Sequence, residues 1–150
     1  VLTVHHWSDK EKGFKELRRV ARDRVVILTF DAAQRGSWLT DYIPALVTLD
    51  EAIMPRMSDY ERWLGPVEIS AVPVPHDCSD GFLYAYWRRP AAYLDPKIRA
   101  AMSSFWTLDN VTAGLEKLAD DLETGAWEDR YSDLLDRENL DVGYRLVVTK

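Results

Sequence analysis

The first thirty residues carry two apolar runs separated by a stretch with helical periodicity. Val1–Val4 is β-branched and apolar, which is typical of a strand buried on both faces. Ser8 and Glu11 have the spacing of a capping box, and apolar side chains then recur every three or four residues. Val25–Phe30 is a second apolar run. This order predicts a βαβ unit with two parallel strands and a right-handed crossover.

The next segment predicts two helices and a third strand. Thr40 or Asp41 can cap a helix, and Ser58–Glu61 repeats the capping-box spacing at the start of another. Gly65, followed by proline, ends that second helix. Val67–Val74 partly alternates and predicts a strand, and its prolines confine the far end to an edge or a bend.

The remainder predicts a long helical block followed by a strand. Residues 77–138 carry repeated caps and helical periodicity, beginning with a helix capped by Ser79 or Asp80, and Tyr144–Thr149 is a last apolar run. The fold class is therefore α/β, with residues 1–76 and 139–150 forming a sheet with flanking helices. A long helical insertion between strands is typical of a cap or lid, so residues 77–138 are expected to cover a site. We expect one domain over residues 1–150.

Composition excludes several classes of protein. Of the 150 residues, 47% are hydrophobic and 29% charged, and no apolar run approaches the roughly 18 residues that span a bilayer. The net charge of −6 argues against binding the backbone of a nucleic acid. The single cysteine, Cys78, excludes an internal disulfide, which favours a cytoplasmic location.

Candidate chemistry lies at the ends of the first two predicted strands. Ligands of open α/β sheets bind outside the carboxyl ends of the strands. The first strand is followed by His5, His6 and Trp7, and the second by Asp31. The alternative is structural: a histidine hydrogen-bonds the backbone or caps the helix, and Trp7 packs against that helix as a hydrophobic staple.

Two further clusters carry polar or aromatic groups. The first, His76–Cys78, lacks the ligand spacing of a metal site, so we expect a turn there and no metal. The second ends in two guanidiniums that could hold a carboxylate or phosphate of a substrate. It comprises Phe82, Tyr84, Tyr86, Trp87, Arg88 and Arg89, of which Tyr84, Trp87, Arg88 and Arg89 are the candidate substrate contacts. Aromatic side chains at such spacing more often belong to a core, and that alternative stays open.

The span Val1–Phe30 resembles a known family. Its Val-Leu-Thr-Val-His-His-Trp-Ser-Asp opening, the helix carrying Glu16–Val20 and the run Arg24–Phe30 are similar to the fourth strand, next helix and fifth strand of class I S-adenosylmethionine-dependent methyltransferases. The small-molecule, type 11 members are the most similar. The resemblance implies a Rossmann-like sheet whose last two strands, Val67–Val74 and Tyr144–Thr149, pair antiparallel. Residues 77–138 would be the family's variable substrate cap.

The family's glycine-rich loop has no counterpart in these residues. The seven glycines are at least eleven residues apart, so no G-x-G-x-x-G occurs. The resemblance therefore implies the C-terminal half of such an enzyme, which alone would not bind S-adenosyl-L-methionine tightly or turn over.

By position, the resemblance implies roles for several residues. His5, His6 and Trp7 would border the methionine end of S-adenosyl-L-methionine, and His6 would take a proton from a small-molecule methyl acceptor. The aromatic cluster would contact that acceptor.

Two alternative hypotheses for the function stay open. One is a non-catalytic ligand- or partner-binding module that forms a homodimer through an exposed strand edge. The other is a fragment of a dehydrogenase, which is less consistent with an antiparallel last strand pair.

Overall fold

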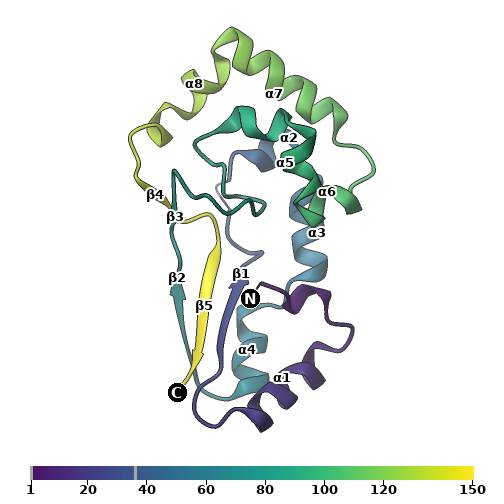
Figure 1. Ribbon diagram of the computed structural model, residues 1–150, viewed down its shortest axis with the longest axis vertical. Helices are drawn as coiled ribbons and strands as arrows, with labels where there is room; N and C mark the ends of the chain where they lie inside the picture. Colours follow the sequence, from purple (N-terminus) through teal and green to yellow (C-terminus); the bar gives the residue numbers. More distant parts are fainter. Residues whose placement is uncertain (1, 36) are drawn as a thin grey trace. The chain divides into compact units, whose positions relative to one another are not determined.

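The computed structural model describes residues 2–35 and 37–150, and its chain divides into two compact units. The first unit comprises Val1–Arg35, Asp50–Pro73 and Gly143–Lys150. The second comprises Gly36–Leu49 and Val74–Val142. The predicted α/β class holds, since both units combine helices with strand pairs (Figure 1).

The first unit is built on a three-stranded sheet in the order β1-β5-β2. Its strands are β1 (Val26–Phe30), β2 (Val67–Ala71) and β5 (Tyr144–Thr149). β5 lies between the other two and pairs antiparallel with both. The predicted antiparallel pairing of the last two strands is therefore confirmed.

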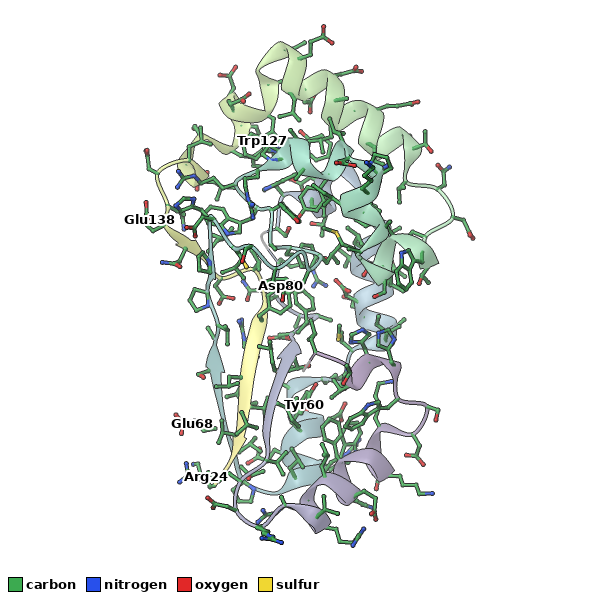
Figure 2. The ribbon with its side chains drawn as sticks, in the orientation of Figure 1. Arg24, Tyr60, Glu68, Asp80, Trp127 and Glu138 are labelled. Carbon is green, nitrogen blue, oxygen red and sulfur yellow. The ribbon has the colours of Figure 1, made fainter. Side chains whose placement is uncertain are left out.

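One face of this sheet is covered by two helices, α1 (Lys10–Val20) and α4 (Met57–Leu64) (Figure 1). Phe14 of α1 is fully buried, with its ring 5.2 Å from the rings of both Tyr60 and Trp63. Tyr60, labelled in Figure 2, places its hydroxyl 2.5 Å from the Thr29 hydroxyl of β1. Burial raises the pKa of Tyr60 to about 12, so the phenol stays protonated and the buried polar pair is satisfied.

The predicted first strand and the parallel βαβ unit are wrong over the described residues. Leu2 and Thr3 have no regular structure, and Val4–His6 forms a 3-10 helix, η1; Val1 lies outside the described residues. The His6 amide donates to the Thr3 carbonyl at 3.0 Å. Val4 is still buried, at 2% exposure, within the core beneath β1. A four-residue apolar run shows that a segment is buried, but it is too short to distinguish a strand from a helical turn.

Helix boundaries differ from the prediction where another residue caps the backbone better. The N-cap of α1 is Asp9, which accepts a hydrogen bond from the Lys12 amide, and not Ser8. α4 begins one residue before the predicted cap, because the Asp59 carboxylate accepts from the Arg56 amide. Gly65 ends α4 at a φ of 82°, as the sequence predicts.

Proline divides two of the predicted elements. The helix predicted from residue 40 is two helices, α2 (Leu39–Tyr42) and α3 (Ala45–Ile53), separated at Pro44. The strand predicted over Val67–Val74 is also divided, at Pro73. β3 (Val74–Pro75) belongs to the second unit, where it pairs antiparallel with β4 (Asn139–Leu140).

The second unit contains most of the predicted helical block. Its helical elements are η2 (Pro90–Leu94), α5 (Pro96–Ala100), α6 (Ser103–Thr107), α7 (Thr112–Thr124), α8 (Ala126–Tyr131) and η3 (Ser132–Leu134). The helix predicted to begin at Ser79 or Asp80 is absent, and residues 83–88 form turns. Tyr84, Ala85 and Trp87 are all buried. These positions fall on different sides of a helix, so consecutive turns bury them better than one helical face would.

Aromatic side chains form the core of the second unit. The Trp38 ring lies 5.5 Å from Tyr93 and 5.3 Å from Trp127, both edge-on. Trp127, on α8, is 1% exposed (Figure 2). The Trp38 indole also donates to the Trp87 carbonyl at 2.6 Å. The core therefore joins α2 to the segment around residue 87.

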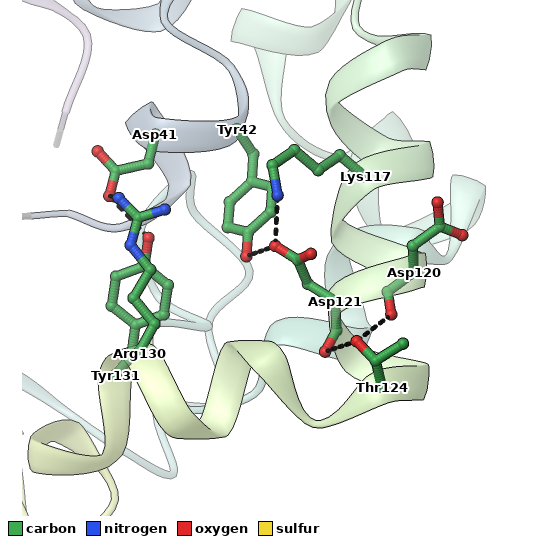
Figure 3. A network of polar contacts seen from close by, with 8 residues as sticks. All are labelled: Asp41, Tyr42, Lys117, Asp120, Asp121, Thr124, Arg130 and Tyr131. Atoms are coloured by element: carbon green, nitrogen blue, oxygen red, sulfur yellow. Dashed lines mark hydrogen bonds and ion pairs between the residues drawn. The ribbon is translucent and has the colours of Figure 1, made fainter.

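A polar network holds α2 against α7 and α8 (Figure 3). Asp121 of α7 accepts from the Tyr42 hydroxyl and from the Lys117 ammonium, each at 2.7 Å. Asp41 accepts from the Tyr131 hydroxyl at 2.7 Å and from Arg130 at 3.1 Å. Both acceptors are carboxylates, so these bonds are charge-assisted.

The network predicts that acid weakens the second unit. Hydrogen bonds from Lys117 and then Tyr42 hold the pKa of Asp121 below its usual value. A depressed native pKa stabilises the fold above the unfolded-state pKa, and that stability is lost as the pH falls through the native pKa. We expect Asp121→Asn to lower the urea midpoint at pH 7, and this difference to shrink below about pH 4. A difference that does not change between pH 7 and pH 3 would contradict this role of the carboxylate charge.

Within the part of the chain that the structure describes, no helix is long and apolar enough to cross a bilayer.

Candidate functional site

A cavity of about 560 Å³ lies in the first unit, where β1 ends. Its lining comprises Asp31, Ala32, Ala33, Glu51, Met54, Pro55, Arg56 and Met57. The first three residues directly follow β1, Glu51 lies on α3, Met57 begins α4, and the remaining three lie between these two helices. The cavity therefore occupies the position where the sequence predicts a ligand site, beyond the carboxyl end of a strand.

Asp31 is held in place at the end of β1 by three contacts. Its amide donates to the Gly143 carbonyl at 2.9 Å, and its Oδ1 accepts from the Ala33 amide at 3.0 Å. Its Oδ2 lies 4.0 Å from Nε of Arg145. Gly143 has a φ of 113°, and a Cβ there would come within 2.6 Å of the Phe30 ring, so this position requires glycine. The carboxylate is thus fixed in direction before any ligand arrives.

The opposite wall of the cavity combines an ion pair with apolar side chains. Glu51 of α3 pairs with Arg35, and this pair ties the loop after β1 to the helix. Met54 and Met57 are half-buried and Pro55 is buried. The cavity therefore offers an apolar surface next to an oriented carboxylate, which is the usual composition of a small-molecule pocket.

The predicted cofactor residues lie at η1 and just after it. The His5 and His6 rings are 3.9 Å apart, with His5 half-buried and His6 exposed. Burial, followed by the neighbouring His6 and Lys10, lowers the pKa of His5, so this imidazole is neutral at neutral pH. The Trp7 ring lies 5.2 Å from Phe14 of α1. Trp7 thus makes the helix contact of the structural alternative, and a cofactor contact by these three residues stays a prediction.

The predicted substrate residues belong to the second unit and are engaged there. Tyr84 and Trp87 are 2% and 1% exposed, and the Trp87 indole donates to the Val74 carbonyl at 3.0 Å. Arg88 donates to the Arg137 carbonyl at 2.9 Å, and Arg89 to the Cys78 carbonyl at 2.6 Å. The structure therefore places the two aromatic residues in a core. Contact of any of the four with a substrate stays a prediction.

The third histidine lies at the pairing of β3 and β4. His76 Nε2 is 3.4 Å from a carboxylate oxygen of Glu138, which lies beside β4 (Figure 2). Cys78 follows in a turn, as the sequence predicts. Among residues 2–35 and 37–150, no three His, Cys, Asp or Glu side chains gather as a metal site requires.

The sequence identified only one residue of the cavity, Asp31. The sequence analysis did not identify Glu51, Met54 or Met57. The pattern of the segment that carries them is typical of an ordinary core-packing helix and does not indicate which residues face the end of β1. A buried strand followed by Asp and two alanines was the available signal, since small residues after a strand leave room for a ligand.

No family model matches the chain, and no curated protein sequence matches it. Among solved structures, the chain is similar to a crystal structure from Anabaena variabilis, described as a "Putative methyltransferase from antibiotic biosynthesis pathway". The TM-score is 0.92 at 37% sequence identity, over 99% of this chain and 64% of the other. The similarity supports a methyltransferase.

The chain therefore spans less than two thirds of the length of that protein. Over the matched region the two share a fold, which includes both compact units described here. The resemblance of the first thirty residues to methyltransferases is thus supported in its general form. Assignment to class I, type 11 stays a prediction.

Proposed function

We propose that this chain is the C-terminal part of an S-adenosyl-L-methionine-dependent methyltransferase that modifies a small molecule. The main support for this proposal is the match to the Anabaena protein, which extends over both units at 37% identity. The cavity after β1 supports a small acceptor, because its volume of about 560 Å³ suits a ligand of drug-like size or less. The proposed location is the cytoplasm.

In the proposal, His5, His6 and Trp7 border the methionine end of the cofactor. The ring of Trp7 and the neutral imidazole of His5 offer an aromatic, uncharged surface, which suits a sulfonium. S-adenosyl-L-methionine would supply the methyl group, which an acceptor takes by in-line attack. The 150 residues hold no G-x-G-x-x-G, so no residue of this chain is assigned to the adenosine end.

The chain's own contribution to the reaction is alignment, exclusion of water and proton transfer. Methyl transfer gains most from holding donor and acceptor in line in a dry pocket. In the proposal His6 accepts the proton of a hydroxyl or amine acceptor, since an imidazole nitrogen can act as a general base. His6 is exposed and adjoins His5, which is neutral, so its imidazole is accessible to a substrate.

The proposed role of His6 predicts a selective loss of rate. In the full-length enzyme, His6→Ala should slow methyl transfer by about 100-fold, the lower range for general base catalysis, while the affinity for S-adenosyl-L-methionine is unchanged. Single-turnover kinetics and calorimetry measure the two quantities. His76→Ala is the matched control, because His76 directly follows β3 and has no proposed role in the reaction. Unaltered turnover in His6→Ala would remove this residue from the mechanism.

The function itself is tested by binding of the cofactor product. S-adenosylhomocysteine should bind the full-length protein at micromolar or lower concentration in calorimetry. It should bind residues 1–150 far more weakly, as the fragment is proposed to be inactive alone. The absence of binding to the full-length protein would contradict the proposal.

One observation favours a second candidate, a binding module that dimerises. β1 and β2 are the two edges of the first unit's sheet, and Val26 of β1 is 59% exposed. Unpaired strand edges can recruit a second chain. In this case, residues 1–150 would sediment as a dimer, and the full-length protein would not bind S-adenosylhomocysteine.

A further inference from the structure

We propose that the cavity at the end of β1 binds an uncharged molecule with an apolar body and one hydroxyl, which donates a hydrogen bond to Asp31. This assignment goes beyond the residues placed by the resemblance. That this molecule is the methyl acceptor rests on the function proposed above, but the binding itself does not.

The volume and the lining of the cavity support a ligand with an apolar body. Met54, Pro55 and Met57 supply apolar lining, and Ala32 and Ala33 are small side chains in the same lining. Methionine side chains are flexible and polarizable, and they make favourable contacts with the edges of aromatic rings. A volume of about 560 Å³ accommodates a ring with short substituents.

The position of Asp31 supports a hydrogen-bond donor on the ligand. A carboxylate can accept about four hydrogen bonds. Oδ1 accepts from the Ala33 amide, and Oδ2 lies 4.0 Å from the Arg145 guanidinium, which is longer than a hydrogen bond. Asp31 lines the cavity and is fixed at the backbone by Gly143. A ligand donor that reached Asp31 would meet an oriented charged acceptor, and such hydrogen bonds are the stronger kind.

The charges around the cavity favour an uncharged ligand. The lining contains two carboxylates, Asp31 and Glu51, and one guanidinium, Arg56. Glu51 is paired with Arg35, and Arg145 approaches Asp31, so a cationic ligand gains little. An anionic ligand would meet the Asp31 carboxylate as well as the single lining guanidinium, Arg56, so it also gains little.

Methylation of such a ligand would remove its donor. If the acceptor's hydroxyl donates to Asp31 when the ligand binds and turns to His6 for the transfer, the O-methyl product can no longer donate to the carboxylate. Asp31 would then distinguish acceptor from product, which is a specificity role for a residue outside the proposed cofactor contacts. A buried polar group left unpaired is the usual basis of such discrimination.

Methionine-methyl NMR tests this with simple probes. Met54 and Met57 line the cavity, whereas Met102 is buried in the second unit and serves as an internal control. The probes are benzyl alcohol, benzyl methyl ether and benzoate, titrated into the full-length protein carrying ¹³C-methyl methionine. Signals are assigned by single Met→Leu exchanges.

We expect benzyl alcohol to shift the Met54 and Met57 signals and leave Met102 unmoved. Its affinity should exceed that of the ether by about tenfold, the value of one charge-assisted hydrogen bond. Benzoate should bind more weakly still. Asp31→Asn should reduce the preference for the alcohol, and Asp31→Ala should abolish it, with the Met102 signal reporting that the second unit is intact.

Several results would overturn the proposal. These are no shift at Met54 or Met57 at millimolar alcohol, equal affinities for alcohol and ether, or an unchanged preference in Asp31→Ala. None of these readouts requires the cofactor. Loss of cofactor binding with intact alcohol binding would therefore reject methyl transfer and keep the site, and the converse would reject the site alone.

Discussion

Replacing Gly114 with alanine is expected to destabilise the second unit by about 3 kcal/mol, the upper range for overpacking a fitted contact. A Cβ built at this position would lie 2.2 Å from the Tyr42 carbonyl oxygen and 3.1 Å from the Ile43 side chain. The obstructing atom is backbone, so a rotamer change cannot relieve the clash. α7 would have to move away from the end of α2.

The sign of this effect is informative. In an exposed helix, Gly→Ala usually stabilises by about 0.5–1 kcal/mol, because glycine loses more backbone entropy on folding. The change in stability is measured by chemical denaturation followed by tryptophan fluorescence. Trp38 and Trp127 report on the core of the second unit, where their rings pack against each other. Glu116→Ala is the matched control, since it is exposed on the same helix and should change stability by less than about 0.5 kcal/mol. A stabilised Gly114→Ala protein would show that the two helices do not approach this closely.

Trp87→Ala is expected to lower the stability of the second unit by about 3–5 kcal/mol, the range for deleting a buried aromatic side chain. Trp87 is 1% exposed, and its indole satisfies the Val74 carbonyl of β3. Its own carbonyl accepts from Trp38. The substitution therefore leaves a cavity and removes one side-chain hydrogen bond to β3.

Two companion variants separate packing from ligand contact. Trp87→Phe keeps most of the volume and removes the indole donor, so a smaller loss of about 1–3 kcal/mol is expected. Arg88→Ala should cost less than about 1 kcal/mol, because its partner Glu138 is exposed. Urea denaturation of the Trp87→Ala, Trp87→Phe and Arg88→Ala proteins measures these losses of stability, which should decrease in that order. A Trp87→Ala protein of unchanged stability and weakened substrate affinity would instead favour the predicted substrate contact.

Local patterns in the sequence determined several elements of this protein. The apolar runs at residues 25–30 and 144–149 form strands, because β-branched and apolar side chains in such runs suit a half-buried pleated surface. Gly65 stops α4, since a positive φ requires glycine. Asp31, predicted to lie at the end of a strand where ligands bind, lines the cavity, although the sheet is antiparallel and not parallel as predicted.

Other features depended on contacts between distant residues. Val1–Val4 has a strand's composition, yet Val4 is buried within a 3-10 turn, because burial alone does not specify backbone hydrogen bonding. The segment after Ser79 is predicted to be a helix, yet residues 83–88 form turns, in which Trp38 and Val74 provide hydrogen-bond partners for Trp87. Neither partner is near Trp87 in the sequence.

The sequence thus identified a candidate polar residue of the cavity, but it did not identify the residues that lie next to it in space. Asp31 is visible as an acid after a strand, but only the packing of α3 and α4 brings Met54 and Met57 to the same cavity. Local sequence sets backbone preferences over a few residues, and those preferences amount to about 1 kcal/mol per residue or less. Burial of a large side chain contributes about 1.5–3 kcal/mol, so tertiary packing decides wherever the two conflict.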